Sequence, residues 1–211
     1  MADRSGGPGA AAMGGVVTSD PSMSDPSTPG PSVSGAAEDG IVVAVMQRGH
    51  LREVTAIEAE SNTHPWPHSL FLGELRMPTS RHWLVALEAD RVVGFAGLMW
   101  TLDEGHITNF AVAGEHRRRQ VATRMLLAQF RDAARLGVVD VSLEVRMSNL
   151  IAQDLYSGFG FVPAGVRRDY YNDNGEDALI MWCHDITGDD QLARLASIES
   201  SLKAPLRRDP A

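Results

Sequence analysis

The sequence predicts a single mixed α/β domain, and three observations support this prediction. The chain has 211 residues and is 44% hydrophobic, which is enough for one domain with a substantial core and some extra length. A strand–helix–strand pattern over residues 105–145 has short connections, which indicates a parallel crossover. Hairpin patterns on either side of this crossover indicate that the other strands are antiparallel, so the sheet is mixed.

Seven segments have the alternation and composition of β-strands. The clearest is 139–145, where valines and Leu143 on one face alternate with Asp140, Ser142 and Glu144 on the other. In chain order, the expected strands are residues 41–46, 82–88, 92–100, 105–112, 139–145, 161–167 and 178–183.

Four segments predict helices. Residues 120–136 carry apolar side chains on one helical face, and Gly137 directly after them is typical of a helix end. Asn149 can cap a helix that runs through Ser157, where Gly158 and Gly160 end it. In chain order, the expected helices are residues 50–60, 69–76, 120–136 and 149–157.

The two ends of the chain differ from the middle in composition. Residues 1–40 consist mainly of Gly, Ala, Ser, Pro and Asp without apolar periodicity, which predicts a disordered leader. Five acidic residues against one Arg give this segment −4 of the net charge of −8. Residues 187–211 form a polar tail with one short helical pattern at 193–202. The domain is therefore expected to span 41–186.

Charge, cysteine content and histidine spacing narrow the class of protein. A net charge of −8 disfavours a protein that wraps nucleic acid with its whole surface. Cys183 is the only cysteine, so no internal disulfide is possible and a reducing compartment is expected. His64 and His68 are separated by two prolines, so they cannot pair on a helix face as zinc ligands do. Without a membrane-length apolar run or a signal-peptide pattern, we expect a cytoplasmic protein that binds no metal and no membrane.

The segment RRRQVATRML at 117–126 places three arginines at the start of a predicted helix. The arginines are either a solvent-exposed helix end, a nucleic-acid patch or the edge of an anion site. Cations at a helix N-terminus are unfavourable unless an anion compensates them, which favours the anion site. A nucleic-acid surface needs basic residues spread over a face, and the only other cluster is Arg167-Arg168, so no direct nucleic-acid binding is expected.

Four longer segments resemble the GNAT N-acetyltransferases, whose coenzyme A-binding core is R/Q-x-x-G-x-G/A. The first is NFAVAGEHRRRQVATRMLL, and LEVRMSNLIAQDLYSGFGF, RRDYYNDNGEDALIM and HPWPHSLF extend the resemblance over about 41–184. These segments are similar to the ribosomal-protein-alanine N-acetyltransferase (RimI-type) subfamily. The resemblance implies a mostly antiparallel six- to seven-stranded sheet with a central parallel pair, flanked by about four helices.

The same resemblance implies a set of residues that bind acetyl-CoA as co-substrate. They comprise a strand that aligns the pantetheine, a pyrophosphate cradle and an Asn, namely Phe110, Ala111, Val112, Arg118, Arg119, Gln120, Val121, Ala122, Thr123 and Asn149. Gln120 departs from the family pattern because it replaces the first Gly. We expect Gln120 to have ordinary helical dihedrals with its side chain turned outward, and Gln120→Gly to tighten acetyl-CoA binding.

Two residues match the family's catalytic pair, with Glu144 as the general base and Tyr156 as the general acid. Glu144 lies near the end of its strand on the face opposite the valines, where a plain solvent-facing residue is the alternative. Tyr156 follows Asn149 by two helical turns, so the two share a face, although a Tyr here can also serve packing alone. A phenol stays protonated at neutral pH and can donate to a thiolate.

The family builds its peptide groove where this chain has Tyr170, Tyr171 and an acidic turn at 173–177, with Trp66 on the far wall. An acidic rim favours basic partners, although a plain hairpin turn explains the same residues. The sequence therefore predicts an acetyltransferase for a protein N-terminus, most specifically the alanine of a small-subunit ribosomal protein. The alternatives are other N-termini, lysines or small amines as acceptors, or a non-catalytic acyl-CoA-binding module.

Overall fold

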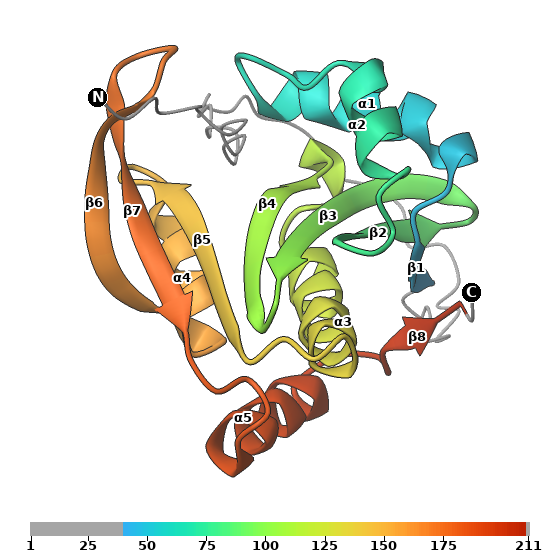
Figure 1. The fold of residues 1–211 in the computed structure, drawn as a ribbon. Coiled ribbons are helices and arrows are strands. Elements are labelled where there is room, and N and C mark those ends of the chain that lie inside the picture. Colours follow the sequence, from blue (N-terminus) through green and yellow to red (C-terminus); the bar gives the residue numbers. More distant parts are fainter. Residues whose placement is uncertain (1–39, 210–211) are drawn as a thin grey trace, which may run out of the picture.

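An eight-stranded mixed sheet forms the middle of the structure, a computed structural model that describes residues 40–209 (Figure 1). The strands are β1 (Ile41–Val45), β2 (Arg81–Glu88), β3 (Arg91–Thr101), β4 (Glu104–Val112), β5 (Asp140–Arg146), β6 (Val162–Tyr171), β7 (Glu176–Cys183) and β8 (Arg207–Arg208). They lie in the order β6-β7-β5-β4-β3-β2-β1-β8. Apart from its last residue, the predicted leader at 1–40 lies outside the described residues.

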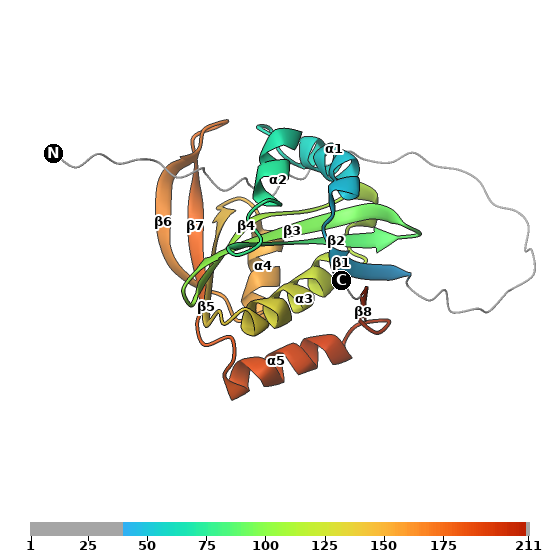
Figure 2. The same cartoon turned by 45° about the vertical axis from the view of Figure 1, so that its right-hand side comes forward.

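Helices cover both faces of this sheet (Figure 2). They are α1 (Leu51–Ser61), α2 (His68–Glu74), α3 (Val121–Arg135), α4 (Leu150–Gly158) and α5 (Asp189–Ser200), with short 3-10 turns at Arg48–His50 and Gly114–His116. One core cluster includes Leu51 and Phe71 of α1 and α2, and a larger one includes Met125 and Tyr156 of α3 and α4. The sheet therefore lies between two helical layers, and α5 lies outside α3.

The predicted crossover is present. Val121, Met125, Leu126 and Phe130 of α3 are buried against the sheet, as their spacing indicated. Gly137, two residues after α3, has φ +84°, a left-handed conformation that suits glycine and ends the helix.

The parallel strands β4 and β5 are paired over only part of their length. Their ladder runs from Glu104↔Asp140 to Ile107↔Leu143, after which β4 continues beside β3 and β5 beside β7. Gly97 pairs with Asn109 and Leu98 with Ile107, so Thr108 is an extra residue that forms a β-bulge in β4 at this point. Figure 1 shows the two strands diverging toward their C-terminal ends.

The C-terminal segment is part of the fold, which corrects the expected boundary at 186. Leu195 of α5 lies in the main core, and Leu206 packs against that core. Strand β8 pairs in parallel with β1 and adds the eighth strand. The sequence shows only a short helical pattern here because a two-residue strand has no periodicity and α5 buries a narrow stripe.

Two further observations complete the fold. Strand β6 continues to Tyr171, beyond the expected end at 167, and its pairing with β7 is irregular between Arg167 and Tyr171. Within residues 40–209, no helix is both long and apolar enough to cross a membrane.

Candidate active site

Glu144 lies at the point where β4 and β5 separate, on the face of the sheet that carries α1 and α2. His106 of β4 pairs with Ser142 of β5 across the parallel ladder, and its Nδ1 lies 3.0 Å from Ser142 Oγ. Its Nε2 lies 3.0 Å from Glu144 Oε2, and Arg167 Nη2 of β6 lies 3.2 Å from Glu144 Oε1. Side chains from β4 and β6 therefore converge on this carboxylate of β5.

The Glu144 side chain is only 4% exposed, yet it is held in its charged form. Burial acts to raise the pKa of Glu144, but His106 and then Arg167 outweigh it, so the pKa lies below its ordinary value. His106 Nε2 is close to Oε2 but out of line for a hydrogen bond, and among residues 40–209 this buried oxygen accepts no well-aligned donor. An ionised, partly unsatisfied carboxylate can accept a proton or a hydrogen bond from a cationic ligand.

A cavity of about 590 Å³ opens above this carboxylate. His106, Thr108, Ser142 and Glu144 lie along its sheet side. Trp66 and Glu74 line it from the α1–α2 side, and Arg167, Tyr170, Ile180 and Trp182 line it from β6 and β7. The volume falls in the range of pockets that enclose a drug-sized ligand, so it can hold more than a single small amine.

The structure separates the three residues expected to bind the acceptor. Trp66 and Tyr170 line the cavity on opposite walls. Tyr171 does not line it and instead lies under the Arg146 guanidinium, 3.9 Å from ring centroid to Cζ. Glu58 of α1 positions Trp66, because its Oε1 accepts the Trp66 backbone N–H at 3.0 Å.

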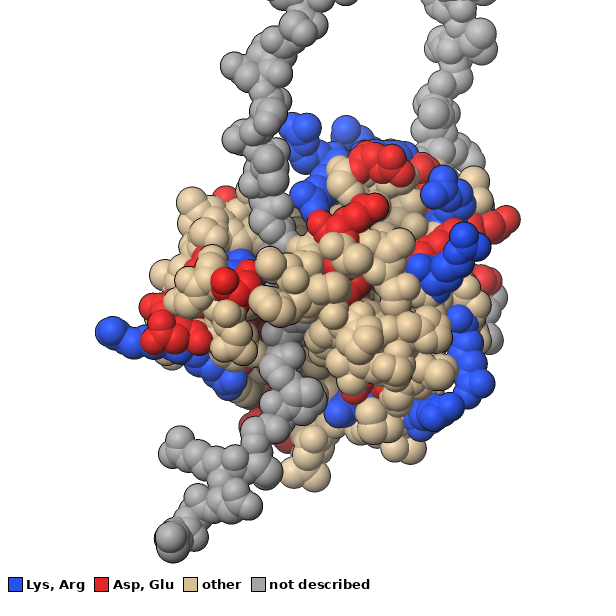
Figure 3. Space-filling model, turned by 90° about the horizontal axis from the view of Figure 1, so that it is seen from above, with Lys and Arg blue, Asp and Glu red and all other residues tan. Residues whose placement is uncertain are grey.

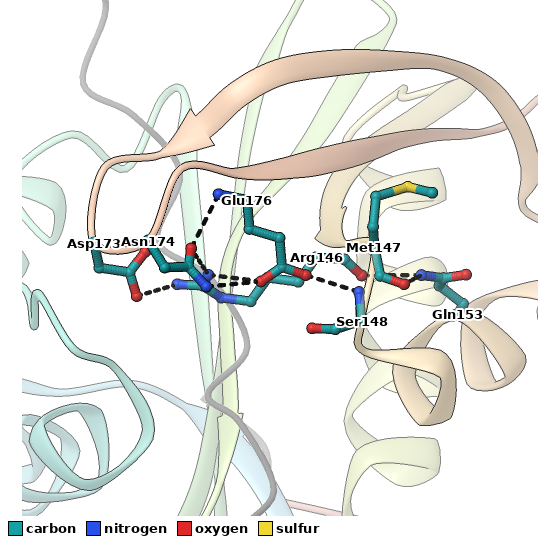
Figure 4. A network of polar contacts seen from close by, with 7 residues as sticks. All are labelled: Arg146, Met147, Ser148, Gln153, Asp173, Asn174 and Glu176. Carbon is teal, nitrogen blue, oxygen red and sulfur yellow. Dashed lines mark hydrogen bonds and ion pairs between the residues drawn. The ribbon is translucent and has the colours of Figure 1, made fainter.

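Arg146, at the end of β5, connects the β6–β7 turn to the start of α4 (Figure 4). Its guanidinium donates to Asp173 at 2.8 Å and to Glu176 at 3.0 Å. Glu176 also accepts the Ser148 backbone N–H at 2.8 Å, and Gln153 of α4 donates to the Arg146 carbonyl at 2.9 Å. This network holds the β6–β7 turn against the segment that leads to Asn149.

The acidic turn at 173–177 is therefore not a free acidic rim. Asp173 and Glu176 are paired with Arg146, and Asp177 Oδ1 accepts the backbone N–H of Asp169 at 2.9 Å. Seen from above, Lys and Arg side chains are intermingled with Asp and Glu side chains around the edge of the molecule (Figure 3). Attraction of a basic partner by this turn alone is weaker than the sequence indicated, because its carboxylates already have internal partners.

The edge of β4 that faces β5 becomes free beyond Ile107. Phe110, Ala111 and Val112 pair with β3 on their other side and have no ladder with β5. Thr108 Oγ1 is buried without a hydrogen-bond partner among the described residues, whereas the Asn109 side-chain amide lies near the Glu58 carboxyl of α1. The backbone N–H and C=O groups at this diverging strand edge are the arrangement that an extended, amide-containing ligand can complete.

The predicted pyrophosphate cradle lies at the start of α3. The first helical hydrogen bond runs from Arg124 N–H to Gln120 O, so the amides of Val121, Ala122 and Thr123 precede the helical ladder and can donate to an anion. Arg119 forms a two-point ion pair with Glu88, which also lies 2.9 Å from His116. The expected compensating anion for this arginine is thus supplied within the chain.

Gln120 does not have the ordinary helical dihedrals that we expected. It caps α3 in the left-handed conformation, with φ 60° and ψ 16°. Its side chain is not turned outward, because Oε1 accepts the Lys203 N–H at 2.9 Å and Nε2 donates to Ser201 O at 3.3 Å. The backbone keeps the positive φ typical of a glycine here, and the side chain binds the C-terminal segment.

Helix α4 carries the other two predicted residues. Asn149 caps this helix, as its Oδ1 accepts the Ala152 N–H at 3.2 Å. Tyr156 is 2% exposed and packs against Phe161 at 5.6 Å between ring centroids. Burial raises the pKa of Tyr156, so its phenol stays protonated throughout the physiological range.

His106, Thr108 and Arg167 were not among the predicted site residues. His106 and Thr108 alternate with Ile107 along a predicted strand, so their shared face could be inferred from the sequence. Their closeness to Glu144 depends on the register between β4 and β5, which no local pattern specifies. Arg167 was considered only as part of a possible basic patch, and the structure places it on the Glu144 carboxylate.

A buried, ionised carboxylate beside a free strand edge suits acyl transfer to an amine, and the comparison of sequences shows that this chain is an N-acetyltransferase. The sequence model of the Acetyltransferase (GNAT) family matches residues 51–161, just over half of the chain. The chain belongs to this family, whose members use acetyl-CoA as the acetyl donor.

Individual relatives carry more specific names. The ribosomal protein bS18-alanine N-acetyltransferase of Salmonella typhimurium (strain LT2) is 36% identical over 143 residues, which cover 66% of this chain and 94% of that protein. A Bacillus subtilis (strain 168) protein with a provisional name for the same activity is 40% identical over 142 residues, covering 65% and 91%. The crystal structure of the Escherichia coli ribosomal-protein-S18-alanine N-acetyltransferase superposes with a TM-score of 0.64 at 27% identity, covering 71% of this chain and 97% of that one.

Proposed function

We propose that this enzyme transfers the acetyl group of acetyl-CoA to the N-terminal α-amine of a ribosomal protein that begins with alanine. The observation that carries the proposal is the buried, ionised Glu144 between the free edge of β4 and the acceptor cavity. The names of the relatives support the choice of acceptor. Ribosomal proteins are made in the cytoplasm, so the proposal places the enzyme there and gives it a protein partner.

The residues of the coenzyme side fit acetyl-CoA. The free edge of β4 at Phe110, Ala111 and Val112 offers backbone groups to an amide-containing arm, and the first-turn amides of α3 offer donors to phosphates. Acetyl-CoA supplies an activated thioester carbonyl and a thiolate leaving group. Arg118 and Arg119 lie on the connection between β4 and α3, and Asn149 lies on the connection between β5 and α4.

On the acceptor side, Glu144 binds the incoming ammonium and accepts its proton. An N-terminal ammonium has a pKa of about 7.7–8.0, so roughly a tenth to a fifth is neutral at pH 7. A lysine side chain, with a pKa near 10.4, is neutral in only about 0.04% of molecules at that pH. Because the pKa of Glu144 is lowered, it is a weak base, which favours the N-terminal amine over lysine.

Attack on the thioester is direct, without an acyl-enzyme. Cys183 is buried, and burial raises the pKa of its thiol to about 11, so it is not a nucleophile at neutral pH. Tyr156 donates the proton that the departing thiolate requires, for which its protonated phenol is suited. His106 and Arg167 hold Glu144 in place and in its ionised form.

The proposal is tested by following free thiol release from acetyl-CoA with a panel of acceptors. The panel comprises an alanine-initiated ribosomal peptide, the same peptide with a blocked N-terminus and an internal lysine, and a polyamine. We expect turnover with the first alone. Turnover with the polyamine or the blocked peptide but not with the first would refute the substrate assignment, and acetyl-CoA binding without turnover on any amine would favour a non-catalytic module.

A further inference from the structure

The segment after α5, residues 201–208, crosses the N-terminal half of α3 before it joins β1 as β8. We call it the C-terminal strap. Helix α5 holds its beginning against α3 through an ion pair between Arg131 and Glu199, and Figure 2 shows α5 along the outer side of α3. The parallel pairing of β8 with β1 holds its end. The family match ends at residue 161, so the strap lies outside it.

The loop that the strap touches has an unfavourable backbone. Arg118 and Gln120 both have φ 60°, in the left-handed region that disfavours residues with a Cβ. In the family pattern the position of Gln120 is a glycine, which adopts this conformation without strain. Some other interaction must hold Gln120 in this conformation here.

That interaction is the strap. The Gln120 side chain binds the strap with both of its polar ends, to the Lys203 N–H at 2.9 Å and to Ser201 O at 3.3 Å. One helical turn later, the fully buried Arg124 donates to Pro205 O at 2.8 Å and to Ala204 O at 2.9 Å. The first turn of α3 is thus tied to the strap by side chains that bind backbone atoms.

We propose that the C-terminal strap supports the acetyl-CoA site from outside it, and that Gln120 is a positioning residue through which the strap holds the pyrophosphate loop. The amides of Val121, Ala122 and Thr123 directly follow Gln120, so the dihedral angles of Gln120 set the direction in which they point. On the other side of the loop, Glu88 holds Arg119 and His116. The loop is clamped from both sides before the coenzyme arrives, which reduces the ordering that binding requires.

This inference rests on the proposed acetyl-CoA-dependent function, so its test uses coenzyme binding as well as turnover. The variants are Gln120→Ala, which removes the tether and keeps the strain, and Gln120→Gly, which removes both. Lys203→Ala is the matched control, because it removes a nearby cation and leaves the backbone N–H that binds Gln120. The readouts are the Kd for coenzyme A by calorimetry, the KM for acetyl-CoA, and kcat.

We expect Gln120→Ala to raise the Kd and KM about tenfold, as for the loss of two hydrogen bonds, with kcat within about twofold. Gln120→Gly should raise the Kd for coenzyme A and the KM for acetyl-CoA by less than Gln120→Ala does. Lys203→Ala should leave both constants within about twofold of the wild-type values. Tighter coenzyme binding by Gln120→Gly would overturn the proposal, because it would show that Gln120 only strains the loop. An equal loss of binding in Lys203→Ala would also overturn it, because the effect would then come from the loss of a positive charge.

Hydrogen exchange supplies a second readout that a purely structural role would not change. By linkage, coenzyme A must protect the Lys203 amide in the wild type if the strap is coupled to the site, and Gln120→Ala must abolish that added protection. An amide whose exchange is unaffected by coenzyme A would refute the coupling. If coenzyme A binds with this coupling but no amine is acetylated, the proposed function fails and the strap inference stands.

Discussion

Glu144→Gln is the substitution that most directly probes the acceptor side. It keeps the shape of a side chain that is 4% exposed and removes its charge, 3.0 Å from His106 Nε2 and 3.2 Å from Arg167 Nη2. The fold should survive, because no volume is lost. The variant should lose the basicity of the carboxylate and its attraction for the substrate ammonium.

The effect on stability is small and has a definite sign. The folded-state pKa of Glu144 is lowered, so its carboxylate contributes stability above the unfolded pKa of about 4.3, and this is lost as pH falls through the folded pKa. The side chain of Arg167 is 55% exposed, which limits that pair to about 0–1 kcal/mol. With the His106 contact, Glu144→Gln should lower the free energy of unfolding by about 1–2 kcal/mol at pH 7, and by less at pH 4.

The effect on catalysis is larger. Removing a general base typically lowers the rate by about 10²–10⁴-fold, which corresponds to about 3–5 kcal/mol. In the wild type, kcat/KM should rise with pH along the titration of the substrate amine near 7.7–8.0. No second ionisation is expected between pH 5 and 7, because Glu144 is already charged there.

The assay is thiol release with saturating acetyl-CoA and an alanine-initiated peptide, from pH 5 to 9, beside thermal unfolding at pH 7 and pH 4. Glu104→Gln is the control, because Glu104 lines the same cavity and is exposed. Its activity should remain within about threefold of wild type. The reasoning is refuted if Glu144→Gln keeps more than about a third of the wild-type rate, or if Glu104→Gln loses as much.

Three further substitutions test other parts of the site. Tyr156→Phe should lower kcat about 10²–10³-fold with the KM for acetyl-CoA unchanged. Its control, Tyr170→Phe, should change mainly the KM for peptide. An unchanged kcat of Tyr156→Phe in steady-state assays would remove Tyr156 from the acid role. Arg146→Met removes the cation that pairs with Asp173 and Glu176, with all three side chains at most 16% exposed. It should lower stability by about 2–4 kcal/mol in urea unfolding. The exposed control Arg52→Met should change it by less than about 0.5 kcal/mol, and equal losses would refute the network's role. Burial raises the pKa of Glu58, so the wild-type protein loses stability as pH rises from about 4.5 through the folded-state pKa of this carboxyl. Over that range the Tm of Glu58→Gln should rise relative to wild type, and a Tm that falls increasingly below wild type would contradict this.

Local patterns account for the elements that were predicted correctly. The alternation in β5 placed Glu144 opposite the buried valines, and the apolar stripe with Gly137 defined α3 and its end. Asn149 caps α4 through its side chain, as its position before an apolar helix indicated. In each case the signal is contained within a few neighbouring residues, which is the range over which propensity and periodicity act.

Non-local geometry explains what could not be predicted. The contacts of His106 and Arg167 with Glu144 depend on the register between β4 and β5 and on the irregular pairing of β6 with β7. Neither feature leaves a local pattern in the sequence. The conformation of Gln120 was misjudged because its partners, Ser201 and Lys203, are about 80 residues away in a segment that seemed a polar tail. Strand β8 is too short to have a periodicity at all.

The central claim concerns which amine receives the acetyl group, and one measurement addresses it without reference to any variant. A single peptide with a free N-terminal alanine and an internal lysine is incubated with the enzyme and acetyl-CoA at pH 7, and the product is sequenced by tandem mass spectrometry. The account predicts acetyl on the alanine α-amine alone. Acetyl on the lysine side chain, with the α-amine free, would contradict it.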